Sequence, residues 1–187
     1  MTKANLFSQR NLGSVPAGES LSAEDVLEYH AARILLLLAH VGDGTIDGLK
    51  KLAKLDFFVR YPAFFAEACV FLGKTPPEGT QTVETHMVRH HYGPWDHRYY
   101  HILAYLESTQ TIKVSKERAR MYRFEITENG LALAQRLSDL PSFKDQIKRM
   151  KRVKAVLGQK NGETLQNLVY TLFENEIGRR EIGETIS

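Results

Sequence analysis

Cysteine is nearly absent from the sequence, and long apolar runs are absent altogether. Cys69 is the only cysteine among 187 residues, so this chain has no internal disulfide and suits a reducing compartment. The longest apolar run covers residues 34–39, whereas a helix needs roughly 18 apolar residues to cross a bilayer. That run also lies too far from the N-terminus for a signal peptide. We therefore expect a cytoplasmic protein with no membrane span.

Signatures of catalysis are missing as well. The sequence contains no nucleophile elbow, and its carboxylates are not grouped in a recognisable acid–base pattern. Residues 68–75 fit a relaxed phosphate-loop pattern, but bulky apolar residues replace its glycines, and two prolines follow where helical amides should hold phosphate. We predict a protein that is not an enzyme and that binds no cofactor.

Histidines gather in one stretch of the chain. Five of the seven lie between positions 86 and 101, and two pairs have the i, i+4 spacing with which a helix presents two zinc ligands. The pair His86 and His90 lacks the glutamate of a metalloprotease helix, and Pro94 separates it from His97 and His101. No cysteine or carboxylate cluster completes a ligand set. We predict no metal site and assign these histidines to the surface or an interface, with zinc binding as the less favoured alternative.

The composition that is present, 43% apolar and 25% charged, is typical of a compact domain with an adequate core. Residues 1–21 show no apolar periodicity and predict a tail or arm. We expect residues 22–137 to form the main domain, which contains a linker rich in proline and glycine at 73–82. Residues 138–187 predict a helical extension.

The order of elements around residues 92–137 indicates the fold. Asp96 follows a Gly-Pro turn and is placed to cap a helix over residues 97–109. Two strands follow at 111–114 and 121–126, the second strictly alternating, and Thr127 then caps another helix with Leu131, Ala134 and Leu137 on its apolar face. A helix, a two-stranded wing and a helix predict a winged helix-turn-helix, mainly α with a minor β part.

Other helices follow from apolar periodicity. The first should begin after Ser22 and bury a stripe around residues 27–38, and the second should be capped by Thr45 and carry its lysines, including Lys54, largely off the buried face. A third runs over 62–72 with proline in its first position, while residues 83–91 fit either a short strand or an irregular segment. Two final helices, 142–157 and one around Leu165, should form a hairpin that packs on the winged-helix domain or on a second subunit.

Positive charge is concentrated near the C-terminus. Residues 142–160 hold seven lysines and arginines against Asp145, a net +6, so the chain's net +3 leaves −3 elsewhere. We predict that this basic helix faces an anionic partner such as DNA, which would offset the repulsion among its charges. The alternative interpretation is a basic face that points only to solvent. The residues we nominate here for contact are Lys148, Arg149, Lys151 and Arg152.

A second group of candidate contacts surrounds the predicted wing. The helix over 97–109 offers few of the side chains that read base edges, whereas its tyrosines and Trp95 are typical of protein interfaces. The wing tip is basic, and we predict that it contacts a partner or a phosphate backbone. The alternative is a tip that points only to solvent. The nominated residues are Trp95, His97, Arg98 and His101, with Lys116, Arg118 and Arg120 at the tip.

Two motifs resemble a known family. Residues 48–62 (GLKKLAKLDFFVRYP), and residues 89–96 (RHHYGPWD) followed by Arg98-Tyr99-Tyr100, resemble the middle component of bacterial ABC-three-component systems. That family includes the small third subunit of Lamassu-type anti-phage and anti-plasmid defence complexes, and the similarity covers roughly residues 27–137. It implies a non-catalytic bridge between an SMC/RecN-like ATPase with long coiled coils and an effector, often a nuclease.

Two hypotheses result. The favoured one is an adaptor subunit that docks on the ATPase and couples DNA sensing there to an effector. The alternative is a free-standing winged-helix transcription regulator that binds DNA itself.

Overall fold

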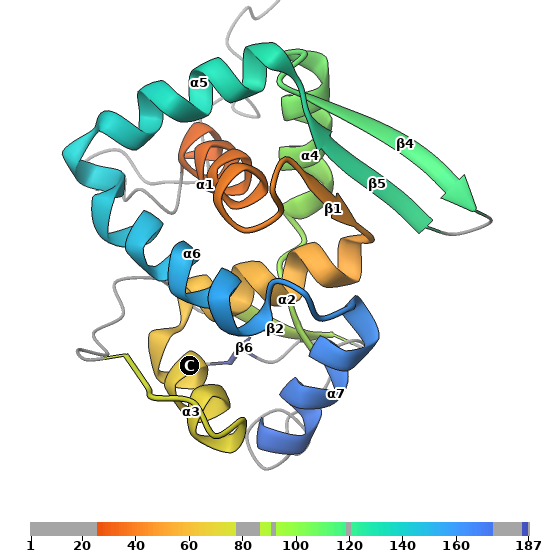
Figure 1. The fold of residues 1–187 in the computed structure, drawn as a ribbon. Coiled ribbons are helices and arrows are strands. Elements are labelled where there is room, and N and C mark those ends of the chain that lie inside the picture. The colour runs from red at the N-terminus through yellow and green to blue at the C-terminus, as the bar shows by residue number, and fades with distance from the viewer. Residues whose placement is uncertain (1–25, 78–86, 91–92, 119–120, 174–184, 187) are drawn as a thin grey trace, which may run out of the picture.

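The structure is a computed structural model and describes residues 26–77, 87–90, 93–118, 121–173 and 185–186 (Figure 1). The expected tail at 1–21 and the expected Ser22 cap lie outside these residues. None of the described helices has the length and apolar character that crossing a membrane requires.

The described residues form a mainly helical fold with two small antiparallel sheets of three strands each. In the first sheet the order is β1-β5-β4, and in the second it is β3-β2-β6. The elements are α1 (Leu27–His40), β1 (Thr45–Asp47), α2 (Leu49–Arg60), α3 (Pro62–Phe71), β2 (Met87–His90), β3 (Gly93–Trp95), α4 (Tyr99–Ser108), β4 (Ile112–Arg118), β5 (Met121–Ile126), α5 (Glu128–Asp139), the 3-10 turn Pro141–Phe143, α6 (Lys144–Leu157), α7 (Gly162–Phe173) and β6 (Thr185–Ile186).

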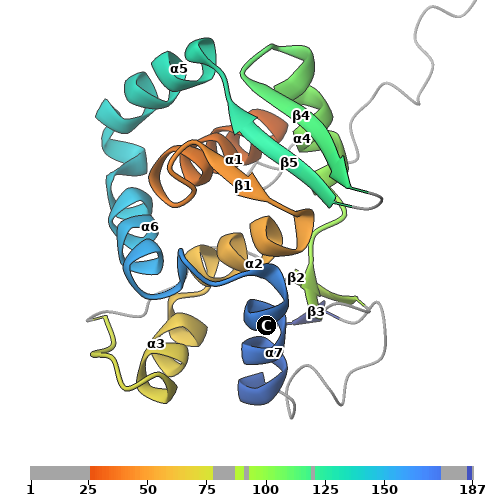
Figure 2. The same cartoon turned by 45° about the vertical axis from the view of Figure 1, so that its right-hand side comes forward.

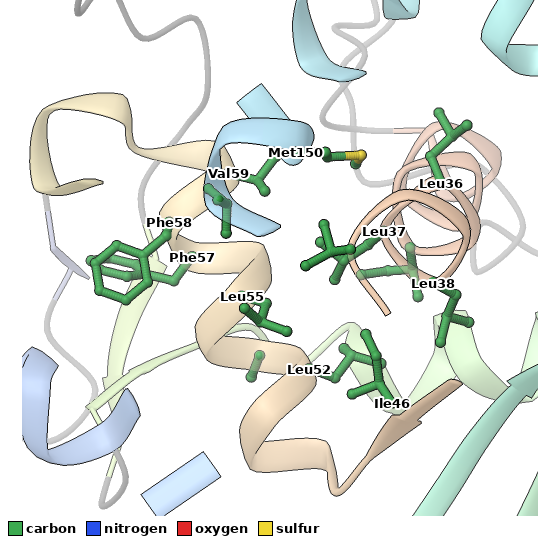
Figure 3. Packing of buried hydrophobic residues seen from close by; sticks show 14 of the residues in the cluster. Leu36, Leu37, Leu38, Ile46, Leu52, Leu55, Phe57, Phe58, Val59 and Met150 are labelled. Atoms are coloured by element: carbon green, nitrogen blue, oxygen red, sulfur yellow. The ribbon is translucent and has the colours of Figure 1, made fainter. Parts of the chain in front are cut away.

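Helix α1 lies at the centre of the molecule, with α2, α4, α5 and α6 around it (Figures 1 and 2). Its residues 34–38 are all fully buried, which no one-sided amphipathic helix would allow. In Figure 3, Leu37 of α1 lies between α1 and α2. Leu52 and Leu55 of α2 and Ile46 of β1 lie close to it. The apolar run in the sequence is therefore the centre of the core.

The predicted start of the second helix is wrong. Thr45–Asp47 is a strand, with Ile46 opposite Phe124 of β5, and the helix begins only at Leu49. Gly48 separates the two elements with φ at +88°, a conformation that L side chains rarely adopt. Thr45 consequently pairs in a sheet and caps no helix.

The prediction that Lys54 lies off the buried face of the second helix is also wrong. Lys54 is fully buried, and so are Asp56 and Arg60 of the same helix. Helix α2 contacts α1, α3, α6, α7 and both sheets. Its residues 52–60 therefore have no face exposed to solvent. The charged residues of α2 must therefore find partners inside the protein.

The β4–β5 hairpin is longer than predicted because β4 continues to Arg118, into the segment expected to be a polar tip. After it, the Thr127 hydroxyl accepts a hydrogen bond from the Gly130 amide at 3.1 Å, which confirms the predicted cap. Ala134 is buried as expected, but Leu131 is 46% exposed, so its assignment to the core is wrong. A Cβ on Gly130 would lie 1.9 Å from the Thr111 carbonyl oxygen, so only glycine permits this approach of α5 to the hairpin.

The last two helices both pack against α2. In α6 the apolar stripe of Ile147, Met150, Val153 and Leu157 is buried, and in α7 Leu165 and Val169 are fully buried. Both helices thus complete the core around α2. Of the segment at 83–91 that the sequence left open, Met87–His90 forms a strand paired with Gly93–Trp95.

Candidate partner-binding surfaces

A buried ionic network joins α1, α2 and the start of α4. The Arg33 guanidinium donates from Nε and Nη2 to the two Asp56 carboxylate oxygens, at 2.9 and 3.2 Å, and both side chains are fully buried. The Tyr99 hydroxyl donates to Asp56 Oδ2 at 2.7 Å. Burial, with the Asp56 charge, raises the pKa of Tyr99 well above its usual value, so this hydroxyl stays a donor.

Asp96 forms the second centre of this network. Its carboxylate accepts from Arg60 Nη1 at 3.0 Å, from Arg98 Nε at 2.9 Å and Nη2 at 2.8 Å, and from the Arg98 amide at 3.0 Å. Burial alone would raise the pKa of Asp96, but the hydrogen bonds and charge of Arg98, helped by Arg60, lower it far below the usual range. Helix α4 begins at Tyr99, two residues later than predicted, and Asp96 binds arginines more than it caps amides.

His30 connects the two centres. Its Nδ1 lies 2.7 Å from Arg33 Nη1 and its Nε2 lies 2.7 Å from Arg98 Nη1. A neutral imidazole has one acceptor nitrogen, so only one of these two contacts is an ordinary hydrogen bond. Arg33 is fully buried on Asp56, whereas the Arg98 side chain is 36% exposed.

The network explains two of the stretches singled out in the sequence. Arg60 belongs to the Val-Arg-Tyr-Pro stretch and Asp96 to the Gly-Pro-Trp-Asp stretch, and their ion pair joins the two. Arg98, predicted to contact a partner, binds Asp96 and His30 within the chain. Its main role is therefore to hold the first turn of α4 against α1 and α2.

The outward face of α4 and the hairpin beside it expose aromatic and neutral side chains. His97 and His101 are exposed, and Tyr100 is 59% exposed. On the hairpin, Met121 and Tyr122 are 40% and 46% exposed. We call these five residues the α4–hairpin surface. Trp95 lies at the end of β3 and Arg118 at the end of β4, but their side chains, like Arg120, lie outside what the structure describes.

One of the basic residues of the hairpin, Arg123, is held in ion pairs. Arg123 bonds Asp47 of β1 and Glu117, each at 2.7 Å, and Lys113 lies opposite Glu125 in the strand register. Lys116 lies opposite Tyr122 and is exposed. Counting basic residues therefore overstates the unpaired positive charge of the described part of this hairpin, because Arg123 is neutralised by Asp47 and Glu117.

The exposed side of α6 is the second candidate surface. Arg149 is half-buried, and its Nε has no hydrogen-bond partner among the described residues. Lys154 pairs with Asp43, and Lys148 with Asp145 at 3.0 Å, in a pair so exposed that it contributes little. His40 of α1 has its pKa lowered by burial and by the charges of Lys151 and Lys154 nearby. The cations on this outward side, which we call the α6 basic face, are Lys144, Lys148, Lys151 and Arg152.

These two surfaces lie on opposite sides of the molecule. In both views α6 borders one side and the hairpin projects from the other, with α1 and α2 between them (Figures 1 and 2). The nominated residues therefore form two separate groups and no single site. Within the described part of the chain, no three histidine, cysteine or carboxylate side chains come together as a metal site would require.

Comparisons of the chain with protein families, curated proteins and solved structures find no match.

Proposed function

We propose that residues 26–137 form a winged helix-turn-helix. Helices α1, α2 and α4 with strands β1, β4 and β5 occur in the order of such a domain, and the sheet order β1-β5-β4 is the one its wing requires. Helix α4 then takes the place of the recognition helix and β4–β5 that of the wing. Helix α3 and the strands β2 and β3 are inserted between α2 and α4.

We further propose that the protein is a non-catalytic adaptor in the cytoplasm, one subunit of an SMC/RecN-like ATPase complex in anti-phage or anti-plasmid defence. The α4–hairpin surface docks on the ATPase, the α6 basic face lies toward DNA, and the complex controls an effector such as a nuclease. The observation that carries this proposal is the placement of an aromatic surface and a basic surface on opposite sides of one small fold. Such a molecule is suited to connect two partners of different chemistry.

A free-standing DNA-binding regulator fits these surfaces less well. A recognition helix that reads the major groove offers arginine, lysine, asparagine or glutamine to base edges. The exposed residues of α4 are instead Tyr100, His101, Ala104, Glu107 and Ser108. His97 precedes the helix, and Arg98 is bound to Asp96. Tyrosine is enriched at protein interfaces, where it buries much area at little entropic loss.

Changing Tyr100 and Tyr122 to alanine is expected to weaken association with the ATPase strongly. Truncating one aromatic interface anchor costs about 2 kcal/mol or more, roughly thirtyfold in affinity. The measurement is co-purification of the complex from its native operon, followed by titration of the purified ATPase with each variant. Both side chains are half-exposed in the chain alone, so the substitutions should leave the fold intact.

Leu131 and Leu140 provide a matched control, since each is 46% exposed and lies on a different part of the surface. Their double alanine variant should bind the ATPase as the wild type does. If the tyrosine variant also binds normally, docking does not use this surface. A chain that purifies alone and binds one palindromic DNA site would establish the regulator in place of the adaptor.

Removing the charge of Lys144, Lys148 and Lys151 is expected to reduce the salt dependence of DNA binding by the assembled complex. Each phosphate contact releases counterions, so log K falls by roughly 0.9 per contact per unit of log salt concentration. Loss of three contacts should flatten that slope by up to about 2.7. Sequence preference should remain weak because lysines at phosphates position a protein without reading bases.

The control for this experiment removes the same charge elsewhere, by changing Lys74, Lys113 and Lys160 to alanine. That variant should keep the wild-type slope. Equal slopes for all three proteins would show that the α6 basic face contacts no phosphate, and its charge would then serve an acidic protein or solubility.

A further inference from the structure

His40 lies in the last turn of α1, a helix that packs against both α5 and α6. Its Nε2 lies 2.9 Å from the Ser138 Oγ of α5, and that hydroxyl donates its only proton to the Ala134 carbonyl oxygen at 2.7 Å. Ser138 must therefore accept from His40, which places the proton of the neutral imidazole on Nε2. Nδ1 is then the nitrogen that takes up a second proton.

Two lysines of α6 act on this imidazole. Lys151 is part of the α6 basic face, and Lys154 lies one turn further along the same helix. Lys154 is bound to Asp43 in the loop that follows α1, so its ammonium group lies near the end of that helix. Burial is the largest cause that lowers the pKa of His40, and the charges of Lys151 and Lys154 lower it further. The last turn of a helix favours a cation, and here two other cations oppose it.

An anion on the α6 basic face would remove part of this opposition. A phosphate group bound at Lys151 offsets the positive charge that acts on His40. The protonated form of His40 is then less unfavourable in the bound state than in the free protein. Because linkage between two binding equilibria is reciprocal, protonation of His40 must strengthen the binding of phosphate by the same factor.

We propose that His40 couples the binding of phosphate groups on the α6 basic face to the uptake of a proton, so that binding tightens as the pH falls. The inference rests on the DNA contact proposed above for this face, and it adds a regulation of that contact. In the free protein the pKa of His40 lies below its usual value of 6.5, so the response should fall on the acidic side of neutrality.

The first test follows the imidazole signals of the full chain by NMR as the pH is changed, with His40→Gln to assign the signal of His40. Adding inorganic triphosphate, or a short DNA duplex of mixed sequence, should raise the pKa of His40. Lys151→Ala should raise it without any ligand, because this variant removes one of the two opposing charges. Lys113→Ala is the matched control, because it removes the same charge from the hairpin on the opposite side of the molecule and should leave His40 unchanged.

The second test measures the affinity of the full chain for the same duplex by fluorescence anisotropy, at about pH 5.5 and about pH 7.5. Wild-type affinity should be about fivefold higher at the lower pH, which is the lower end of the usual coupling between two sites. His40→Gln keeps an amide N–H for Ser138 and cannot take up the proton. Its affinity should therefore lose most of this pH dependence, while its salt dependence stays as in the wild type.

The proposal is overturned if an anion binds and the pKa of His40 does not move, or if His40→Gln keeps the wild-type pH dependence. It is also overturned if the chain binds neither anion. A raised pKa of His40 with triphosphate, but no binding of DNA by the assembled complex, would support the coupling and refute the DNA contact proposed for this face. Salt-dependent binding of DNA through this face with no change at His40 would do the reverse.

Discussion

Replacing Asp56 by alanine is expected to lower the free energy of unfolding by about 3–5 kcal/mol, enough to unfold many domains of this size. The carboxylate is the partner of two fully buried groups, the Arg33 guanidinium and the Tyr99 hydroxyl. Its removal leaves the fully buried charge of Arg33 without its carboxylate partner, so the desolvation of that charge is no longer compensated by the ion pair. Urea unfolding followed by circular dichroism measures the change.

Asp47→Ala is the control, because it removes an arginine partner at the surface. The Asp47–Arg123 pair has exposed fractions of 48% and 37%, so its loss should cost only about 0–1 kcal/mol. A double variant with Arg33→Met and Asp56→Leu should recover much of the stability, because it removes both charges together. If Asp56→Ala is as stable as Asp47→Ala, the Arg33–Asp56 pair does not hold α1 to α2 in solution.

The features predicted correctly are those that depend on a few neighbouring residues. Thr127 caps its helix through a side chain three residues from the amide it binds, and Pro62 stands in the first position of α3 as its fixed φ favours. The buried stripe of α6 follows from its own periodicity. In each case the physical cause lies within one or two turns of the residue concerned.

The errors come from contacts between distant parts of the chain. Thr45–Asp47 is a strand because β5, far along the sequence, pairs with it, and the spacing of Ile46 and Leu49 imitated a helix. The sequence predicts Lys54 off the buried face because charged residues usually face water. A signal against that placement was present: the apolar residues Leu55, Phe57, Phe58 and Val59 occur on every side of α2. A helix of that composition has to bury its charged residues too.

The sequence predicts which types of residue the candidate surfaces contain. It does not predict how those residues are paired or where the surfaces lie in the fold. Counting basic residues identified α6 and the hairpin, but it could not reveal that Arg123 is paired with Asp47 or that Arg98 is held by Asp96. It also could not show that the two surfaces lie on opposite sides of α1 and α2. Those facts depend on strand register and helix packing.

Lys54→Met is expected to raise the stability of the protein near pH 7. Burial, with a smaller effect from the charge of Lys50, lowers the pKa of Lys54 from 10.5 to about 7 in the folded protein. The unfolded chain keeps the ordinary pKa and therefore binds one more proton between about pH 7 and about pH 10.5. A shift of this size opposes folding by up to about 5 kcal/mol at pH 7. Methionine has a similar length and shape and carries no charge, so it should relieve most of that opposition, less whatever contacts the amine makes.

The pH dependence of stability distinguishes removal of the buried Lys54 charge from better packing by methionine as the reason for a gain in stability. Because the unfolded state binds more protons across that window, wild-type stability should rise with pH, by up to about 1.4 kcal/mol per unit, while Lys54→Met lacks this contribution. The advantage of the variant should therefore be largest at and below about pH 7 and shrink toward about pH 10. Urea unfolding of both proteins at several pH values measures it, with Lys116→Met, at an exposed position, as the control. A variant less stable than the wild type near pH 7, or an advantage that does not change with pH, would show that the buried amine does not oppose folding.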